Sequence, residues 1–401
     1  MTSGLRGRAT VWLGRSAVPR LLWWSRRLLP AGHVVVVAGF PPSEGNAVET
    51  VRALRRRYSG RVVWVDGPPP GHPARDDTAG VTVVPRYSRA ALTAYARAEA
   101  VFFTHGLYGA PRTVPGRPTV NLWHGSGMKA MGGSLLPDRR ATGPMADLLV
   151  SGARVWGEYY ARLMDLDPAH VVYSGNPRID AFGRPVPAEG LTRLGLDPAA
   201  PFVLWMPTFR RSAGTGLAPG WSDSGPTAEA DLATAAARLS DGLAARGVRL
   251  VVKPHPLDAT LGSVPGALVV TDADVADAGL ELYELLGSAA GLVTDVSSVW
   301  TDFLVLDRPI AFLFPDRDAY LERRGVHPAD VHEHLPGREL VDSGDVDRFA
   351  EEVLGDASSA DLRAACAEWI GLARPAGSAA DAMLDHLASG GTSFARRLRR
   401  G

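Results

Sequence analysis

The stretch HVVVVAGF, residues 33–40, is a short valine-rich run that ends in a glycine and an aromatic residue. Similar runs recur along the chain, namely RVVWVDG (61–67), VTVVP (81–85), AVFFTHG (100–106), TVNLWHG (119–125), LLVSG (148–152), VVYSGNP (171–177), FVLWMPTF (202–209), RLVVKPHP (249–256), ALVVTD (267–272), GLVTD (291–295) and IAFLFPD (310–316). Helical segments separate them. Continuous apolar runs that alternate with helices predict parallel strands covered on both faces. The sequence therefore predicts an α/β fold.

The length of 401 residues exceeds what one hydrophobic core usually organises, so two domains are expected. The stretch AFGRPVPAEG, residues 181–190, interrupts regular structure with proline and glycine and marks the boundary. We predict a basic amphipathic segment over 1–30, a Rossmann-like N-terminal domain over 31–183, a Rossmann-like C-terminal domain over 184–388 and a basic tail over 389–401. The two domains are expected to face each other across a cleft.

Both ends of the chain are basic, although the formal net charge is zero. Residues 1–30 contain arginines and no acidic residue, and SFARRLRRG closes the chain. In RLLWWSRRLLP, residues 20–30, Leu21 and Leu28 share one helical face while Arg20 and Arg27 lie on another. No run reaches the roughly 18–20 apolar residues that a membrane span needs. The pattern favours a helix lying on an anionic membrane surface, and a solvated terminal arm is the alternative.

The composition also bears on the cellular compartment. Cys366 is the single cysteine and cannot form an internal disulfide, which fits a reducing cytoplasm. The predicted localisation is cytoplasmic, peripheral on the inner face of the cell membrane. A nucleic-acid partner is not expected.

Two histidines are the candidate catalytic residues. The only two lysines are Lys129 and Lys253, and each lies close to a histidine that ends a predicted strand. His124 and His255 are these histidines, and a histidine held by a rigid strand end can deprotonate a hydroxyl nucleophile. The other histidines, including His105, are interpreted as structural residues.

A candidate phosphate site lies in GLVTDVSSVWTDFLVL, residues 291–306. The first turn of the helix after this strand offers free backbone N–H groups, and Ser297 and Ser298 add hydroxyl donors. Plain capping by Asp295 or Ser297 is the alternative interpretation. Asp302, one helical turn further on, suits a ribose hydroxyl. Arg210, directly after the strand in PTFRRS, suits phosphate oxygens.

Other cofactor signals are weak. No GxGxxG follows the first strand, and no P-loop motif is present. The DAD at residues 272–274 is interpreted as a polar turn, and no Cys/His cluster indicates zinc. We predict no dedicated metal site and no required cofactor, while a divalent cation carried by a donor diphosphate stays open.

Five segments, in this order, resemble the CDP-glycerol glycerophosphotransferase family of teichoic acid primases and polymerases: NLWHGSGMKAMG (121–132), SGNPRID (174–180), LWMPTFRRS (204–212), VVKPHP (251–256) and LVTDVSSVWTDFLVLDRPIAFLFPD (292–316). The resemblance covers about residues 100–385. It departs from the family pattern at Ser126, Gly127 and Val296. The lack of a long N-terminal extension favours a primase or short transferase.

The resemblance implies a GT-B-like fold, an acceptor-binding first domain and a nucleotide-binding second domain. The implied site comprises catalytic His124 and His255, donor-binding Lys253, Thr208, Arg210, Asp295, Ser297, Ser298 and Asp302, and acceptor-side Gly125, Lys129 and Arg178. The implied reaction moves a polyol phosphate, such as glycerol phosphate, from a CDP-polyol donor to a hydroxyl of a lipid-linked polymer acceptor. The alternatives are a GT-B glycosyltransferase that uses a nucleotide sugar and a non-catalytic polymer-binding protein.

Overall fold

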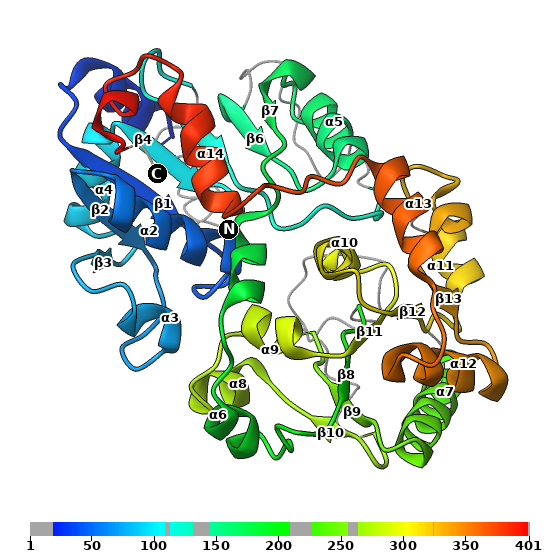
Figure 1. Ribbon diagram of the computed structural model, residues 1–401. Helices are drawn as coiled ribbons and strands as arrows, with labels where there is room; N and C mark the ends of the chain where they lie inside the picture. Colours follow the sequence, from blue (N-terminus) through cyan, green and yellow to red (C-terminus); the bar gives the residue numbers. More distant parts are fainter. Residues whose placement is uncertain are drawn as a thin grey trace, which may run out of the picture. The chain divides into compact units, whose positions relative to one another are not determined.

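The computed structural model describes residues 19–108, 113–130, 145–208, 226–255, 264–323 and 325–399, and the chain divides into two compact units (Figure 1). The first unit comprises Met1–His124, Gly132–Asp180 and Ala373–Gly401. The second unit comprises Gly125–Met131 and Ala181–Leu372. The chain therefore leaves and re-enters the first unit more than once.

The first unit is built on a parallel sheet. Its strands are β1 (Val34–Ala38), β2 (Arg61–Val65), β3 (Thr82–Val84), β4 (Ala100–Phe103), β5 (Thr119–Asn121), β6 (Leu148–Val150) and β7 (Val171–Val172), in the order β3-β2-β1-β4-β5-β6-β7. Every residue of β1 is buried, as the unbroken valine run predicts. The strand order reverses between β1 and β4, and in such sheets ligands bind beyond the carboxyl ends of the strands at this point.

Helices accompany this sheet. They are a helix over 19–28, α2 (Gly45–Arg57), α3 (Pro73–Asp76), α4 (Arg89–Arg97), α5 (Arg154–Leu163) and α14 (Ala379–Ala388), with the 3-10 segments η2 (Pro168–His170), η3 (Pro177–Gly183) and η6 (Ala395–Arg397). Their starts follow local capping chemistry. Ser88 accepts a hydrogen bond from the Ala91 amide at the start of α4, and Glu44 does the same for Ala47 in α2.

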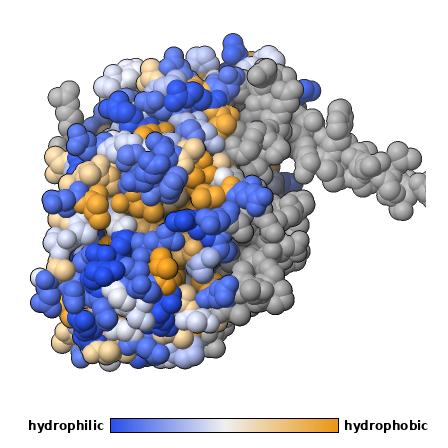
Figure 2. Space-filling model, turned by 90° about the vertical axis from the view of Figure 1, so that its right-hand side faces the viewer, coloured by the Kyte–Doolittle hydropathy of each residue, from blue (hydrophilic) through white to orange (hydrophobic). Residues whose placement is uncertain are grey.

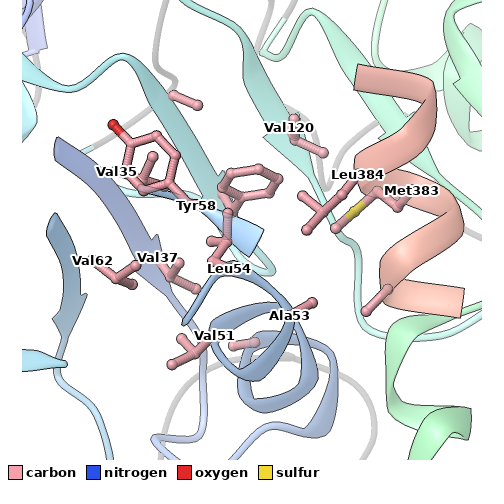
Figure 3. Packing of buried hydrophobic residues seen from close by; sticks show 14 of the residues in the cluster. Val35, Val37, Val51, Ala53, Leu54, Tyr58, Val62, Val120, Met383 and Leu384 are labelled. Carbon is pink, nitrogen blue, oxygen red and sulfur yellow. The ribbon is translucent and has the colours of Figure 1, made fainter. Parts of the chain in front are cut away.

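The final helix completes the core of the first unit. Met383 and Leu384 of α14 belong to the same buried cluster as Leu54 of α2 and Val120 of β5 (Figure 3). Arg57 adds a hydrogen bond of 2.9 Å to the Asp381 carbonyl. The predicted C-terminal domain over 184–388 therefore needs correction, because residues 373–388 bury their apolar side chains in the first unit.

The predicted basic tail over 389–401 also packs on the first unit. Phe394 is fully buried in the same cluster, and Leu398 is nearly so. The Arg397 side chain lies 3.0 Å from the carboxylate of Glu99, which also accepts a hydrogen bond from the Tyr58 hydroxyl. The described part of the tail is thus held by folded contacts.

The N-terminal helix over 19–28 combines an anchored side and an exposed side. Arg26 is 1% exposed and donates to the Thr119 hydroxyl (2.7 Å) and the Arg117 carbonyl (2.9 Å), so it does not belong to a basic surface as predicted. Leu21 and Leu28 are 68% and 74% exposed. Within the described ranges, no helix has both the length and the apolar character needed to cross a membrane.

The second unit is also built on a parallel sheet. Its strands are β8 (Phe202–Trp205), β9 (Arg249–Val252), β10 (Leu268–Val269), β11 (Gly291–Thr294), β12 (Ile310–Phe312) and β13 (Arg338–Glu339), in the order β10-β9-β8-β11-β12-β13. The order reverses between β8 and β11, which repeats the pattern of the first sheet. The predicted pair of Rossmann-like α/β domains is confirmed.

The helices of the second unit are α6 (Ala188–Arg193), α7 (Pro226–Ala245), α8 (Asp272–Asp277), α9 (Leu282–Ser288), α10 (Val299–Phe303), α11 (Arg317–Arg323), α12 (Ser343–Leu354) and α13 (Ala360–Ile370), with η4 (Leu304–Leu306) and η5 (Val331–His334). Trp205, Leu239 and Phe349 are fully buried in its core. On the face shown in Figure 2, hydrophilic residues surround a connected apolar area near the middle of the described surface.

Candidate active site

His124 lies in a tight turn directly after β5. The Asn121 side chain accepts a hydrogen bond of 2.9 Å from the Trp123 amide. Trp123 has a φ of 53° and Gly125 a φ of 132°, a value that side chains rarely permit. Gly125 therefore permits the backbone conformation of the turn that contains His124. The His124 side chain is partly exposed.

The predicted acceptor-side residue Arg178 supports this turn. Its guanidinium donates to the His124 carbonyl at 3.0 Å and lies 3.5 Å from the Glu44 carboxylate. Asn46 donates to the Trp123 carbonyl at 3.3 Å and accepts from the Arg178 amide at 3.1 Å. Sequence reasoning missed Glu44 and Asn46, although their position just after β1 marks the same edge of the sheet.

His105, which the sequence analysis interpreted as a structural residue, lies directly beside His124. It follows β4, the strand next to β5, and its ring stacks on His124 with centroids 4.3 Å apart and planes at 19°. The Thr104 hydroxyl lies 3.0 Å from its Nδ1. Desolvation by the surrounding protein, followed by the charges of Arg178 and Arg86, lowers the pKa of His105 to about 4, although the residue keeps an exposed part.

In the second unit, Asp295 joins two strand ends. Its carboxylate accepts hydrogen bonds from the Thr208 amide (2.9 Å), the Thr208 hydroxyl (2.7 Å) and the Ser297 amide (3.1 Å). Both Asp295 and Thr208 are buried. This geometry holds the end of β8 against the end of β11, so Asp295 shapes the candidate donor site. Arg210 lies outside the described residues.

The serine pair opens a short helix. Ser298 is the N-cap of α10, which has five residues, so its backbone N–H groups rather than a long helix dipole are the donors available here. Gly127 lies directly against this serine, because a β-carbon on Gly127 would approach Ser298 Cβ to 2.6 Å.

Gly127 belongs to a segment that directly follows His124 in sequence but packs in the second unit. Lys129 forms an isolated antiparallel bridge with Val326, and the His327 amide donates to the Met128 carbonyl at 2.7 Å. The predicted acceptor-side Lys129 is thus anchored through its backbone to the second unit.

Lys253 and His255 follow β9 in a turn. Lys253 is 4% exposed, and its ammonium donates to the Pro254 carbonyl and pairs with Asp272, each at 3.0 Å. Asp272 comes from the DAD segment, which forms the first turn of α8 rather than a loop. Lys253 therefore fixes the turn that precedes His255.

Asp302 is buried in α10 and accepts a hydrogen bond of 2.7 Å from the Tyr283 hydroxyl. Tyr283 stacks on Phe182 with ring centroids 5.5 Å apart. Within the portion of the chain that the structure describes, no group of three or more His, Cys, Asp or Glu side chains is arranged to hold a metal ion.

Comparison with solved structures places the fold. The chain is similar to the wall teichoic acid polymerase TagF, with a TM-score of 0.66 and 18% identity over 96% of each chain. It is also similar to S. aureus MnaA with UDP, with a TM-score of 0.53 and 15% identity over 89% of this chain and 96% of that one. These similarities confirm the predicted GT-B-like fold class.

Sequence comparison gives the family. Residues 43–363 match the family described as CDP-Glycerol:Poly(glycerophosphate) glycerophosphotransferase, and the chain belongs to this family, as the resemblance implied. It is 35% identical over 113 residues to the teichoic acid glycerol-phosphate primase of Bacillus spizizenii. That alignment covers 26% of this chain and 28% of the primase.

Proposed function

We propose that the protein transfers a polyol phosphate, glycerol phosphate in the simplest case, from a CDP-activated donor to a hydroxyl of a lipid-linked acceptor. Family membership supports the reaction class. A relative named as a glycerol-phosphate primase and a TagF structure soaked with CDPG support the choice of donor. The observation that carries the proposal is the braced turn in which Arg178 holds the carbonyl of His124.

In the proposed mechanism, an acceptor oxygen attacks the phosphorus that bears the polyol. A new P–O bond forms, the bond from this phosphorus to the bridging oxygen breaks, and CMP leaves with that oxygen. His124 takes the proton of the acceptor hydroxyl as general base. Catalysis then consists of positioning both partners and stabilising the charge on the phosphoryl oxygens.

The candidate donor residues divide into two groups in this scheme. Ser297, Ser298 and His255 contact the diphosphate directly in this proposal, and Arg210, assigned to the same role from the sequence, lies outside the described residues. Asp295 and Lys253 act behind them, because their charged groups hold Thr208 and the Pro254 turn. A divalent cation carried by the diphosphate is compatible with this arrangement.

Measurement of CMP release tests the reaction. With CDP-glycerol and a lipid-linked hydroxyl acceptor, His124→Ala and His255→Ala are each expected to lower turnover by roughly two to four orders of magnitude, as loss of a general base or a charge-stabilising group does. Wild-type rates in either variant would remove that histidine from the mechanism. A donor panel with CDP-ribitol and UDP-sugars tests the glycosyltransferase alternative, and polymer binding without CMP release from any donor would support a binding protein.

We further propose that the helix over 19–28 brings the protein to the inner face of the cell membrane. Leu21, Trp24 and Leu28 are exposed on it, and Arg20 and Arg27 are exposed beside them. Apolar side chains flanked by arginine suit insertion at an anionic lipid surface. Arg26 has no part in this contact because its guanidinium is buried.

Liposome co-sedimentation tests this proposal. The combined Leu21→Ser, Trp24→Ser, Leu28→Ser variant should lose binding to anionic vesicles, while keeping Arg26 and hence the anchoring of the helix. Wild-type binding should weaken with salt, because the Debye length falls from about 10 Å at 0.1 M to about 3 Å at 1 M. Equal binding of both proteins at low salt would contradict the assignment.

A further inference from the structure

His105 has no role in the proposed mechanism, although its ring stacks on that of the candidate base, His124, with centroids 4.3 Å apart. A second ring contacts it edge-on, because the Phe40 centroid lies 5.7 Å away at 76°. Phe40, His105 and His124 follow β1, β4 and β5, which are adjacent strands of the first sheet, and all three residues belong to the first unit. The His105 ring is therefore held by contacts from both neighbouring strands.

The Thr104 hydroxyl determines which nitrogen of His105 carries the proton. Thr104 is fully buried, and its hydroxyl oxygen accepts a hydrogen bond of 3.1 Å from the Phe40 amide and lies 3.0 Å from Nδ1 of His105. A buried hydroxyl proton needs an acceptor, and Nδ1 is the acceptor that the described residues offer to it. Nδ1 therefore accepts from Thr104, and the proton of the neutral ring is on Nε2.

The surroundings of His105 also keep its ring uncharged. Desolvation, followed by the positive charges of Arg178 and Arg86, lowers the pKa of His105 to about 4. A proton on His105 would in addition repel a proton on the stacked ring of His124. The residue is exposed, and among the residues that the structure describes none hydrogen-bonds to its Nε2. Nε2–H is thus a hydrogen-bond donor that a bound molecule can reach.

The neighbouring ring of His124 reacts through the corresponding nitrogen. Its Nδ1 is buried, so a bound acceptor gives its proton to this ring at Nε2. The planes of the two rings are inclined by 19° and their centroids are 4.3 Å apart. At this spacing one oxygen atom can lie within about 3 Å of a nitrogen of each ring, which is the length of a hydrogen bond. The stacked pair can therefore hold one hydroxyl group with two nitrogens.

We propose that His105 positions the acceptor hydroxyl by donating its Nε2–H to the hydroxyl oxygen. A hydroxyl group has one proton and two lone pairs. With the proton directed to His124 and one lone pair held by His105, the second lone pair is left for attack on phosphorus. His124 takes the hydroxyl proton as the new P–O bond forms, and His105 neither gains nor loses a proton. The inference rests on the proposed role of His124 as general base.

Two substitutions separate this hydrogen bond from the stacking. His105→Phe keeps an aromatic ring and removes the donor, whereas His105→Gln removes the ring and keeps an N–H donor as many bonds from the backbone as Nε2. CMP release is measured with saturating CDP-glycerol and dodecyl phosphoglycerol as the lipid-linked hydroxyl acceptor. In His105→Phe, kcat/KM for the acceptor should fall by about a hundredfold, as misplacement of a reacting group does, and in His105→Gln by less than about tenfold. A stacking role alone predicts the opposite order.

Thr104 provides a matched pair of variants that leave His105 in place. Thr104→Val removes the hydroxyl at nearly constant shape, and Thr104→Ser keeps it. Nitrogen-15 spectra of the imidazole groups should show the His105 proton on Nε2 in the wild type and in Thr104→Ser, and a mixture of tautomers in Thr104→Val. In Thr104→Val alone, kcat/KM for the acceptor should fall by about tenfold. Thr192→Val, at an exposed position of α6, is the control and should match the wild type.

Calorimetric titration with dodecyl phosphoglycerol distinguishes this assignment from the proposed function. The wild type should bind this acceptor about tenfold more tightly than His105→Phe, as loss of one hydrogen bond implies. Such binding without CMP release in the wild type would overturn the proposed function alone. The assignment of His105 is overturned by a proton on Nδ1 in the wild type, by His105→Phe being as active as His105→Gln, or by a wild type that binds the acceptor no better than His105→Phe.

Discussion

Gly127 and Ser298 are packed so closely that a β-carbon on Gly127 would lie 2.6 Å from Ser298 Cβ and 2.9 Å from Ser298 Cα. The loop that follows the candidate base is therefore in direct contact with the candidate phosphate loop, and only glycine fits at this contact. Any side chain at residue 127 must displace the backbone of the serine pair.

We predict that Gly127→Ala lowers kcat/KM for CDP-glycerol by about tenfold to a hundredfold, because a shift of about 1 Å in positioning groups has effects of this size. Calorimetric binding of CDP should weaken in parallel. Gly183→Ala is the control, since no atom lies within 4 Å of a β-carbon there, and it should behave as wild type. Unchanged CDP binding in Gly127→Ala would mean that Ser298 does not contact the donor.

Arg178 pairs with the Glu44 carboxylate and donates to the His124 carbonyl, and two variants separate the effects of these contacts. Arg178→Met keeps the length of the side chain but leaves the buried Glu44 carboxylate without its guanidinium, which should cost about 3–5 kcal/mol of unfolding free energy. Adding Glu44→Gln removes the buried charge and should restore most of the stability. Turnover should stay low in both variants, because neither supplies a donor to the His124 carbonyl. If the Arg178→Met, Glu44→Gln variant recovered turnover as well as stability, the role of Arg178 would be structural only.

Asp295→Asn should weaken the hydrogen bonds that connect the end of β8 to the end of β11. The carboxylate accepts from the Thr208 amide, the Thr208 hydroxyl and the Ser297 amide, and a carboxamide has only one oxygen to accept with. We expect KM for CDP-glycerol to rise and the temperature midpoint of unfolding to fall by several degrees, as losses of about 1–3 kcal/mol do. Thr208→Val, which removes only the hydroxyl, should show a smaller effect of the same kind. If Thr208→Val had as large an effect as Asp295→Asn, the whole contribution of Asp295 to KM and stability would come from its hydrogen bond with the Thr208 hydroxyl.

The stability of the protein should depend on the protonation of His105. Its pKa is about 4 in the folded chain against 6.5 ordinarily, so between these values the unfolded chain binds a proton that the folded chain does not. The contribution of His105 to the free energy of unfolding is therefore fully present above pH 6.5, the ordinary pKa of histidine, and is lost as the pH falls towards about 4. The urea concentration at the midpoint of unfolding should decrease when the pH is lowered from about 7.5 to about 5. The decrease should be smaller in His105→Phe, which keeps an aromatic ring but cannot titrate. An identical fall in both proteins would exclude His105 as the source.

Much of the fold could be predicted because burial on both faces of a parallel sheet requires continuous apolar runs. Each valine-rich run contains a strand. The strand β13 was missed, because its two residues, Arg338 and Glu339, are charged and carry no apolar signal. The local sequence pattern showed which segments form strands, but it did not show which strands lie next to each other in the sheet.

The candidate site residues were chosen where a single segment carried its own sequence signal. His124 follows β5 and Ser298 is the N-cap of α10, and both lie in segments with a sequence signal of their own, whereas the stack of His105 on His124 depends on β4 lying next to β5. The burial of Arg26 depends in the same way on the distant Thr119 and Arg117. Contacts between segments far apart in sequence leave no local pattern, so the sequence predicted neither the stacking of His105 on His124 nor the burial of Arg26.

The return of the chain to the first unit determines the order in which a ribosome can complete the protein. Met383, Leu384 and Phe394 fill the core around α2 and β1, yet they are synthesised after every residue of the second unit. At about 5–20 residues per second, the nascent chain exposes the uncovered apolar surface of α2 throughout the synthesis of the second unit. The first unit is thus the first to emerge from the ribosome and the last to be completed.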